Sequence, residues 1–290
     1  MEDAIHKEKI NLVHSIIKLA LAEDLEPNGD ISAPCLTSKT AKAQIIAKEP
    51  GVMACSWLVE AVLRQYDPNT TFNIISNCQD SLSFEAGQIL FTIEANSRNI
   101  VATERTILNF LQRLCGIATY TNKLVKLIQD YPVKLLDTRK TMPGMRVLEK
   151  AAFKYGGGTN HRFNLSDMVM LKENHLACIE DLSEVISKFK NEAMKIEVEI
   201  NKDNLAKLEL AIQAGVDQIM LDNFSPAEIK ELKNKIALLP MPQPKLEASG
   251  GINESNLVDY AKTGVDYIST SISFTKANNI DLSMMITELH

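Results

Sequence analysis

Two patterns of hydrophobic and polar positions follow one another along the chain. Apolar residues recur at helical spacing over residues 4–22, and the polar run EPNGD then ends the predicted helix. Three shorter apolar runs follow, separated by Gly, Pro, Asn and Asp, at 41–55, 71–77 and 87–95. Runs of this kind are typical of β-strands. Helical spacing returns over residues 103–129, where Thr103 and Glu104 suggest the helix start.

Beyond residue 132 the chain alternates between strand-like and helix-like segments. Six short apolar runs predict strands at 133–137, 168–172, 196–200, 218–222, 245–249 and 267–271. Helical spacing with start and stop signals appears between them, for example at 204–215, 225–237 and 253–264. Near-continuous apolar strands alternating with helices predict a parallel sheet covered by helices. Six strands fit either an α/β barrel with fewer than eight strands or an open doubly wound sheet.

Polar residues at the strand ends favour the barrel. Each of the six strands ends in or near polar side chains, which are Asp137 with Arg139 and Lys140, Lys172, Glu199, Asp222, Ser249, and Ser269 to Ser271. Barrel enzymes collect their functional groups at the carboxyl ends of parallel strands. One such residue would mean only that a strand reaches water, but six in succession favour a site. The predicted fold is therefore an incomplete, about six-stranded α/β barrel over residues 116–274. An α+β open sandwich over 1–115 precedes it, joined by the C-terminal segment 275–290.

Charge and composition narrow the class of ligand. The 290 residues carry a net charge of -6, with 45% hydrophobic and 23% charged residues, as in soluble globular proteins. The window 137–175 holds seven Lys or Arg against four Asp or Glu, so it is +3 and the remainder is -9. A local cationic region on an acidic chain favours a small anionic ligand and argues against nucleic acid.

The apolar runs, the N-terminus and the cysteines suggest where the protein is located. No apolar run is long enough to span a bilayer, and the N-terminus lacks the features of a signal peptide. The five cysteines, at 35, 55, 78, 115 and 178, have no metal-ligand spacing, so reduced thiols in a cytoplasmic protein are expected.

Anion-binding residues follow the first two barrel strands. Arg139 offers a planar fork for a carboxylate or phosphate, and Lys140 a compact charge. The run GGGTNHR then places His161 and Arg162 after three glycines that allow close approach to a ligand. Each pair alone would fit an exposed loop. Lys172 follows four apolar residues, so it either reaches the surface or lines the site.

Carboxylates and a glycine turn follow the later strands. Glu199 and Asp222 could hold Mg²⁺ carried by a phosphorylated substrate, bind sugar hydroxyls, or simply pair with the lysines. Ser249, Gly250 and Gly251 lie between a strand and a helix start, a setting that favours phosphate. The chain shows no Ser-His-Asp order, no cysteine nucleophile and no metal-ligand cluster. Two anion clamps, two carboxylates and a phosphate cradle fit a phosphorylated sugar with an acidic co-substrate.

The segment DTRKTMPGMRVLEKAAFKYGGGTNHRFNLSDMVMLKENH resembles the signature of quinolinate phosphoribosyltransferase, also called nicotinate-nucleotide pyrophosphorylase (carboxylating). The resemblance extends to LAEDLEPNGDIS, TERTILNFLQRLCGIATYT, IEVEI, IMLDNFSP and LEASGGI, and so covers nearly the whole chain. It implies transfer of phosphoribose from 5-phosphoribosyl-1-pyrophosphate (PRPP) to quinolinate, with Mg²⁺ and no organic cofactor. The products are nicotinate mononucleotide, pyrophosphate and CO₂, in NAD biosynthesis.

The resemblance also implies roles for residues and a dimer. Quinolinate's carboxylates are assigned to Thr138, Arg139, His161, Arg162 and, from the neighbouring subunit, Arg105. Lys140 and Lys172 are assigned to the departing pyrophosphate. Glu199 and Asp222 are assigned to the ribose and the metal. The 5'-phosphate of PRPP is assigned to Ser249, Gly250, Gly251 and Ser271.

Ser271 departs from the family pattern, which usually has glycine there. Its Cβ would crowd the phosphate, although its backbone N–H and hydroxyl remain available. Two alternatives therefore stay open. One is a related phosphoribosyltransferase-like branch linked to molybdate transport, and the other is a catalytically silent nucleotide-binding homologue.

Overall fold

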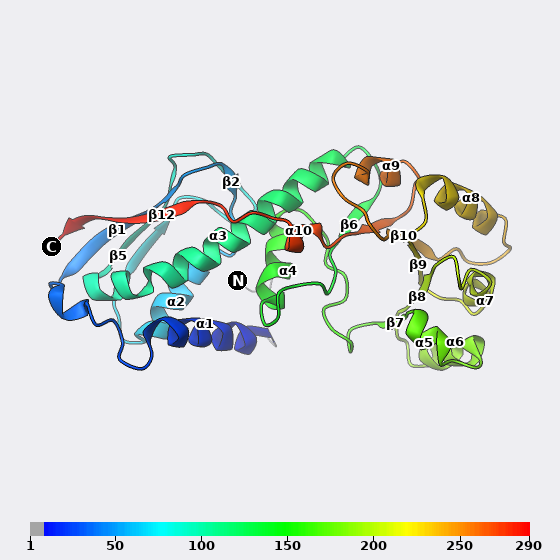
Figure 1. The fold of residues 1–290 in the computed structure, drawn as a ribbon, viewed down its shortest axis with the longest axis horizontal. Helices are drawn as coiled ribbons and strands as arrows, with labels where there is room; N and C mark the ends of the chain where they lie inside the picture. The colour runs from blue at the N-terminus through cyan, green and yellow to red at the C-terminus, as the bar shows by residue number, and fades with distance from the viewer. Residues whose placement is uncertain (1–8) are drawn as a thin grey trace. The chain divides into compact units, whose positions relative to one another are not determined.

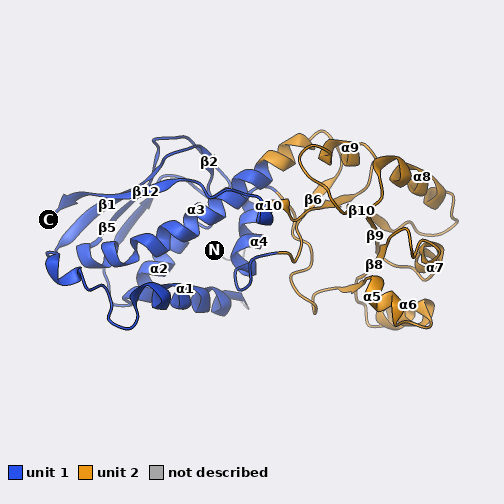
Figure 2. Ribbon diagram, in the orientation of Figure 1, with its two compact units in different colours: residues 1–122, 141–157, 273–290 blue, residues 123–140, 158–272 orange. Residues whose placement is uncertain are grey.

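The computed structural model describes residues 9–290 and divides into two compact units, coloured separately in Figure 2. Unit 1 comprises the described residues up to Asn122 together with Thr141–Gly157 and Ser273–His290. Unit 2 comprises Lys123–Lys140 and Gly158–Ile272. The expected boundary between residues 115 and 116 falls inside the long helix α3, which spans Ser97–Leu127.

Unit 1 is built on a four-stranded antiparallel sheet in the order β12-β1-β5-β3. Its strands are β1 Thr40–Ala47, β3 Asn73–Ser76, β5 Ile89–Asn96 and β12 Leu282–Leu289, and the pair β2 Gly51–Val52 and β4 Ser83–Phe84 forms a separate ribbon. Alternate residues of β1 are buried, so one face of this sheet packs into a core. The C-terminal strand β12 extends the sheet beside β1, which brings residues far apart in the sequence into one unit (Figure 1).

The helices of unit 1 are α1 Ile10–Leu25, α2 Leu58–Tyr66, most of α3, α4 Arg146–Tyr155 and the short α10 Ile272–Thr275, with a 3-10 turn η2 Ala33–Cys35. The helix expected at 4–22 corresponds to α1, and its first residues, 4–8, lie outside the described part of the chain. The start predicted for α3 at Thr103 is wrong. The helix begins six residues earlier at Ser97, because the Asn96 side chain accepts a hydrogen bond from the Arg98 N–H at 3.0 Å and caps it.

A buried ion pair holds α3, α4 and the C-terminal segment together within unit 1. Glu149 of α4 is fully buried and accepts from Arg113 of α3 at 2.8 Å. Arg113 also donates to the backbone oxygen of Phe274 at 2.5 Å. A buried carboxylate is tolerated because the guanidinium neutralises it. Residues 141–157, expected with the barrel, therefore pack within unit 1.

Unit 2 contains the six predicted parallel strands in the order β6-β11-β10-β9-β8-β7. They are β6 Lys134–Leu136, β7 Val169–Leu171, β8 Ile196–Ile200, β9 Gln218–Asp222, β10 Lys245–Ser249 and β11 Tyr267–Ser269. Each strand from β7 to β11 lies beside the next in sequence, so the winding direction never reverses as it does in a doubly wound sheet. The sheet curves into an arc whose ends are β6 and β7 (Figure 1). The prediction of an incomplete barrel is confirmed.

Helices cover the outside of this arc (Figure 1). They are α5 Glu173–Ala177, α6 Leu182–Asn191, α7 Lys207–Gln213, α8 Pro226–Ala237 and α9 Leu257–Ala261. Helix α8 begins where the sequence predicted, because Ser225 and Glu228 cap it reciprocally. Helices α7 and α9 are shorter than expected because their first predicted residues form turns. Among the described residues, no helix is both long and apolar enough to cross a bilayer. The cysteines are free thiols.

Candidate active site

A pocket of about 320 Å³ opens at the carboxyl ends of the unit 2 strands. Most of the residues predicted for the site line it, namely Thr138, Arg139, Lys140, His161, Arg162, Lys172, Glu199, Asp222 and Ser249. The other lining residues are Asp137, Met170, Met220 and Ser269. Parallel strands end at the same edge of the sheet, which explains why residues far apart in sequence meet here.

Four of the side chains that line the pocket are cationic. They are Arg139, Lys140, Arg162 and Lys172. Burial lowers the pKa of the Arg162 guanidinium, and the nearby charge of Arg139 lowers it further. A bound anion would relieve this repulsion between guanidinium groups. The loop that carries Lys140 is held by a turn, in which the Lys140 N–H donates to Thr138 Oγ1 at 3.1 Å.

Two carboxylates face these cations. Lys172 forms an ion pair with Glu199, so the pairing weighed as an alternative for Glu199 is present. Burial raises the pKa of the Asp222 carboxyl, and the charge of Glu199 raises it further. A carboxyl whose pKa is raised by a neighbouring carboxylate, as that of Asp222 is by Glu199, fits a divalent cation, because the cation would remove the repulsion. The pair thus suits Mg²⁺ brought by a phosphorylated substrate.

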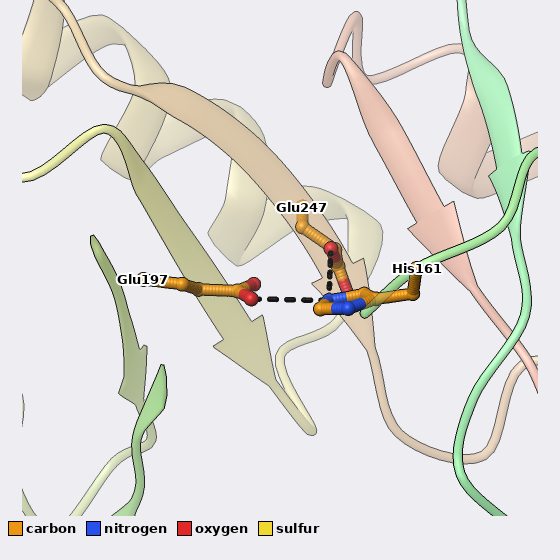
Figure 3. A group of neighbouring side chains, drawn as sticks. All are labelled: His161, Glu197 and Glu247. Atoms are coloured by element: carbon orange, nitrogen blue, oxygen red, sulfur yellow. Dashed lines mark ion pairs between the residues drawn. The ribbon is translucent and has the colours of Figure 1, made fainter. Parts of the chain in front are cut away.

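His161 lies against two buried glutamates below the pocket (Figure 3). Its Nε2 lies 3.0 Å from Oε2 of Glu197 and 3.5 Å from Oε2 of Glu247. Both glutamates are 0% exposed. Gln218 lies on the strand between them and donates from Nε2 to both, at 2.9 Å to Glu197 and 2.5 Å to Glu247. The structure therefore brings together a cluster of metal-ligand residue types that the sequence did not reveal. Its carboxylates already accept hydrogen bonds from Gln218.

The cluster of His161, Glu197 and Glu247 favours the protonated forms of its side chains. Burial alone would lower the pKa of His161, but the two glutamates raise it to about 10. Burial, and then the charge of Glu197, raises the pKa of Glu247 to about 7. The Arg162 N–H donates to His161 Nδ1 at 2.6 Å, which opposes a proton on that nitrogen. The imidazole proton therefore lies on Nε2, and the further proton that the cluster favours belongs on a carboxylate.

The remaining predicted residues lie outside the pocket lining. Gly250 and Gly251 follow Ser249 in the turn after β10, and both have left-handed backbones, with φ of 95° and 61°. Ser271 follows the end of β11. Arg105 lies on α3 in unit 1 and is not among the residues that line the pocket.

Two functional candidates that were not predicted, Glu197 and Glu247, lie one layer deeper in the sheet. Glu197 precedes Glu199 by two positions on β8, and Glu247 precedes Ser249 by two on β10. Residues two apart on a strand share a face, so each pair points to the same side of the sheet. That spacing could have identified Glu197 and Glu247 as interior residues.

An incomplete barrel with a cationic pocket at its strand ends indicates an enzyme that acts on small anionic substrates. Comparison with known proteins identifies the family of the enzyme. Residues 30–115 match the model of the quinolinate phosphoribosyl transferase N-terminal domain, and residues 117–285 match that of its C-terminal domain. The chain belongs to the quinolinate phosphoribosyltransferase family.

Individual relatives agree over nearly the whole chain. A probable nicotinate-nucleotide pyrophosphorylase (carboxylating) from Synechocystis is 35% identical over 268 residues, covering 92% of this chain and 90% of that protein. Its Bacillus subtilis counterpart is also 35% identical, covering 91% and 90%. The structure of the nicotinate-nucleotide pyrophosphorylase from Francisella tularensis superposes with a TM-score of 0.87 at 38% identity, covering 96% of each chain.

Proposed function

We propose that this protein transfers phosphoribose from PRPP to quinolinate with loss of CO₂, in NAD biosynthesis. The observation that carries the proposal is the pocket, in which four cations face two carboxylates at the strand ends of a chain of this family. Quinolinate and PRPP are both polyanions, and a cationic pocket attracts both.

The cations divide between the two substrates. Arg139 and Arg162 bind the carboxylates of quinolinate through their planar forks, with Thr138 and His161 beside them. Lys140 and Lys172 stabilise the pyrophosphate as it gains charge on leaving. When PRPP binds, Lys172 must leave its ion pair with Glu199 and contact the substrate instead. The Glu199 carboxylate then becomes available to the ribose and the metal.

The ribose and phosphate interact with the later strands. Glu199 and Asp222 accept hydrogen bonds from the ribose hydroxyls and would hold Mg²⁺ that arrives with PRPP. Mg²⁺ would supply charge neutralisation to the pyrophosphate. Ser249, Gly250, Gly251 and Ser271 bind the 5'-phosphate through backbone N–H groups.

The reaction follows from this arrangement of charges. The bond from ribose C1 to pyrophosphate breaks, and the electron pair leaves with pyrophosphate. Glu199 and Asp222 stabilise the positive charge that develops on the ribose. The pyridine nitrogen of quinolinate then bonds to C1 and becomes quaternary. That nitrogen stabilises the electron pair left at the adjacent ring carbon when CO₂ departs, and a proton from solvent completes nicotinate mononucleotide.

Assembly and location complete the proposal. The protein works in the cytoplasm as a dimer or larger assembly, in which Arg105 of each subunit reaches the quinolinate bound by its neighbour. The support for this is the resemblance of the segment around Arg105 to the family.

The test is a turnover assay with quinolinate, PRPP and Mg²⁺ that follows nicotinate mononucleotide and CO₂. Product that requires all three additions is expected. Folded protein that forms no product would contradict the proposal and favour a silent homologue. Binding of PRPP without turnover would support the catalytically silent nucleotide-binding homologue.

A further inference from the structure

Two of the residues proposed to bind quinolinate lie on a segment without regular structure. Residues 160–168 form neither helix nor strand, yet they contain His161 and Arg162. Side chains on such a segment keep a fixed geometry only if other contacts hold them. Arg162 is nonetheless only 9% exposed and donates from Nη1 to the Met168 backbone oxygen at 3.3 Å. Something in the fold must hold this segment in place.

His161 is the point at which the segment is anchored. Its backbone N–H donates to Oδ1 of the fully buried Asp137 at 2.8 Å. Its ring uses both nitrogens, since Nδ1 accepts from the Arg162 N–H and Nε2 faces the two glutamates. An imidazole held at both nitrogens has a single tautomer and one ring orientation. The same ring fixes the backbone amide of Arg162.

The glutamates that hold the ring are themselves fixed. Gln218 bridges them from the strand between β8 and β10, so their oxygens have little freedom. Placing two carboxylates in a core costs more than placing apolar residues of the same size there. Stability alone therefore does not explain this pair. Orienting a histidine at the base of a binding pocket does.

We propose that Glu197 and Glu247 are positioning residues, which hold the His161 ring from the deeper layer of the sheet and thereby orient the segment 160–168 that carries Arg162. This inference rests on the proposed function for the identity of the substrate. The raised pKa values of His161 and Glu247 agree with a cluster that keeps its protons.

The kinetic test uses Glu197→Gln and Glu247→Gln, which keep the size of the side chain and remove its charge. The KM for quinolinate should rise about tenfold or more, the effect of weakening one charge-assisted hydrogen bond. The KM for PRPP should change by less than about twofold, because both glutamates contact His161 and Gln218 and neither contacts a residue assigned to PRPP. The exposed Glu231→Gln on α8 is the matched control and should leave both constants unchanged.

Two kinetic outcomes would overturn the proposal. One is an unchanged KM for quinolinate in both folded variants. The other is an equal rise in both KM values, which would mean a general loosening of the barrel.

A second measurement does not depend on turnover. The ¹⁵N shifts of labelled histidine, assigned with His161→Asn, report which ring nitrogen carries the proton. In the unmodified protein His161 should carry it on Nε2, and in the double variant Glu197→Gln, Glu247→Gln the Nε2 shift should move, because the charged carboxylates that Nε2 faces are gone. A proton on Nδ1 in the unmodified protein, or an unchanged spectrum in the double variant, would overturn the positioning role. An inactive protein with the expected spectrum would instead contradict the substrate assignment alone.

Discussion

Arg139 and Arg162 lie close enough for one charge to lower the pKa of the other. Like charges are brought together in this way where an anion is to be bound. In the proposed reaction the anion is a dicarboxylate, and each guanidinium offers it a bidentate contact. The role of the two arginines can be separated from that of the lysines by kinetics.

We expect Arg139→Ala or Arg162→Ala to raise the KM for quinolinate and largely abolish turnover. Loss of a charged hydrogen bond corresponds to about ten- to a hundredfold in binding. Steady-state kinetics with each substrate varied in turn would measure this. Arg139→Lys is the informative comparison, because it keeps the charge and loses the fork. Unchanged kinetics in both alanine variants would rule out the carboxylate clamp.

The buried cluster of His161, Glu197 and Glu247 predicts how stability depends on pH. The pKa of Glu247 is raised from 4.5 to about 7 and that of His161 from 6.5 to about 10. The folded state therefore binds more protons than the unfolded state between these values, and its stability falls as pH rises through them. Melting temperatures should decline from about pH 4.5 to about pH 10.

Glu247→Gln should flatten the lower part of this decline, because the group that titrates there is gone. Thermal unfolding over the same pH series would show it, with Glu231→Gln, an exposed carboxylate, as the control. A slope unchanged by Glu247→Gln would contradict the assignment of the raised pKa to this residue.

At the scale of elements, the turn between β10 and α9 contains two glycines with different surroundings. A Cβ on Gly250 would lie 2.7 Å from the Asn223 backbone nitrogen and closer still to its side-chain oxygen. A Cβ on Gly251 would meet nothing within 4 Å. Both residues have positive φ, so both substitutions strain the backbone, but only the first also displaces the neighbouring turn after β9.

We therefore expect Gly250→Ala to raise the KM for PRPP markedly and to destabilise the protein. Gly251→Ala should cost about 1–2 kcal/mol, the strain of a left-handed alanine, with a smaller effect on PRPP. Chemical denaturation and PRPP kinetics on both variants would test the pair. Equal effects would mean that close packing against Asn223 has no part in forming the phosphate cradle.

At the scale of the whole molecule, the position of Arg105 in unit 1 raises the question of which site it serves. If Arg105 serves the neighbouring subunit, each active site takes Lys172 from one chain and Arg105 from the other. Arg105→Ala and Lys172→Ala then remove residues that different chains contribute to the same site. Each variant alone should be nearly inactive. Mixing and reassembling them should restore about one quarter of the activity, because half the dimers are mixed and each has one intact site.

Activity assays on the reassembled mixture, with equal mixing verified by mass, would measure this recovery. Lys140→Ala mixed with Lys172→Ala is the control and should not recover, because both residues belong to the same pocket. Absence of recovery with Arg105→Ala in a verified mixed dimer would mean that Arg105 serves its own subunit or neither.

The sequence predicted more of the barrel than of the other unit, for a physical reason. A buried parallel strand such as β7 or β9 contains an unbroken apolar run, so its position is visible locally. The start of α3 depends on a cap at Asn96, and residues 141–157 pack within unit 1 because Glu149 pairs with Arg113. Both depend on single side chains outside the hydrophobic pattern.

By itself, the sequence determined the six parallel strands, the polar residues at their ends and the family. These features are local, because strand ends and signature motifs are contiguous in the chain. Only the tertiary structure decided that Lys172 pairs with Glu199 and that Gln218 bridges two buried glutamates around His161. Those contacts join different strands of the sheet, and which strands become neighbours is set by the packing of the whole barrel.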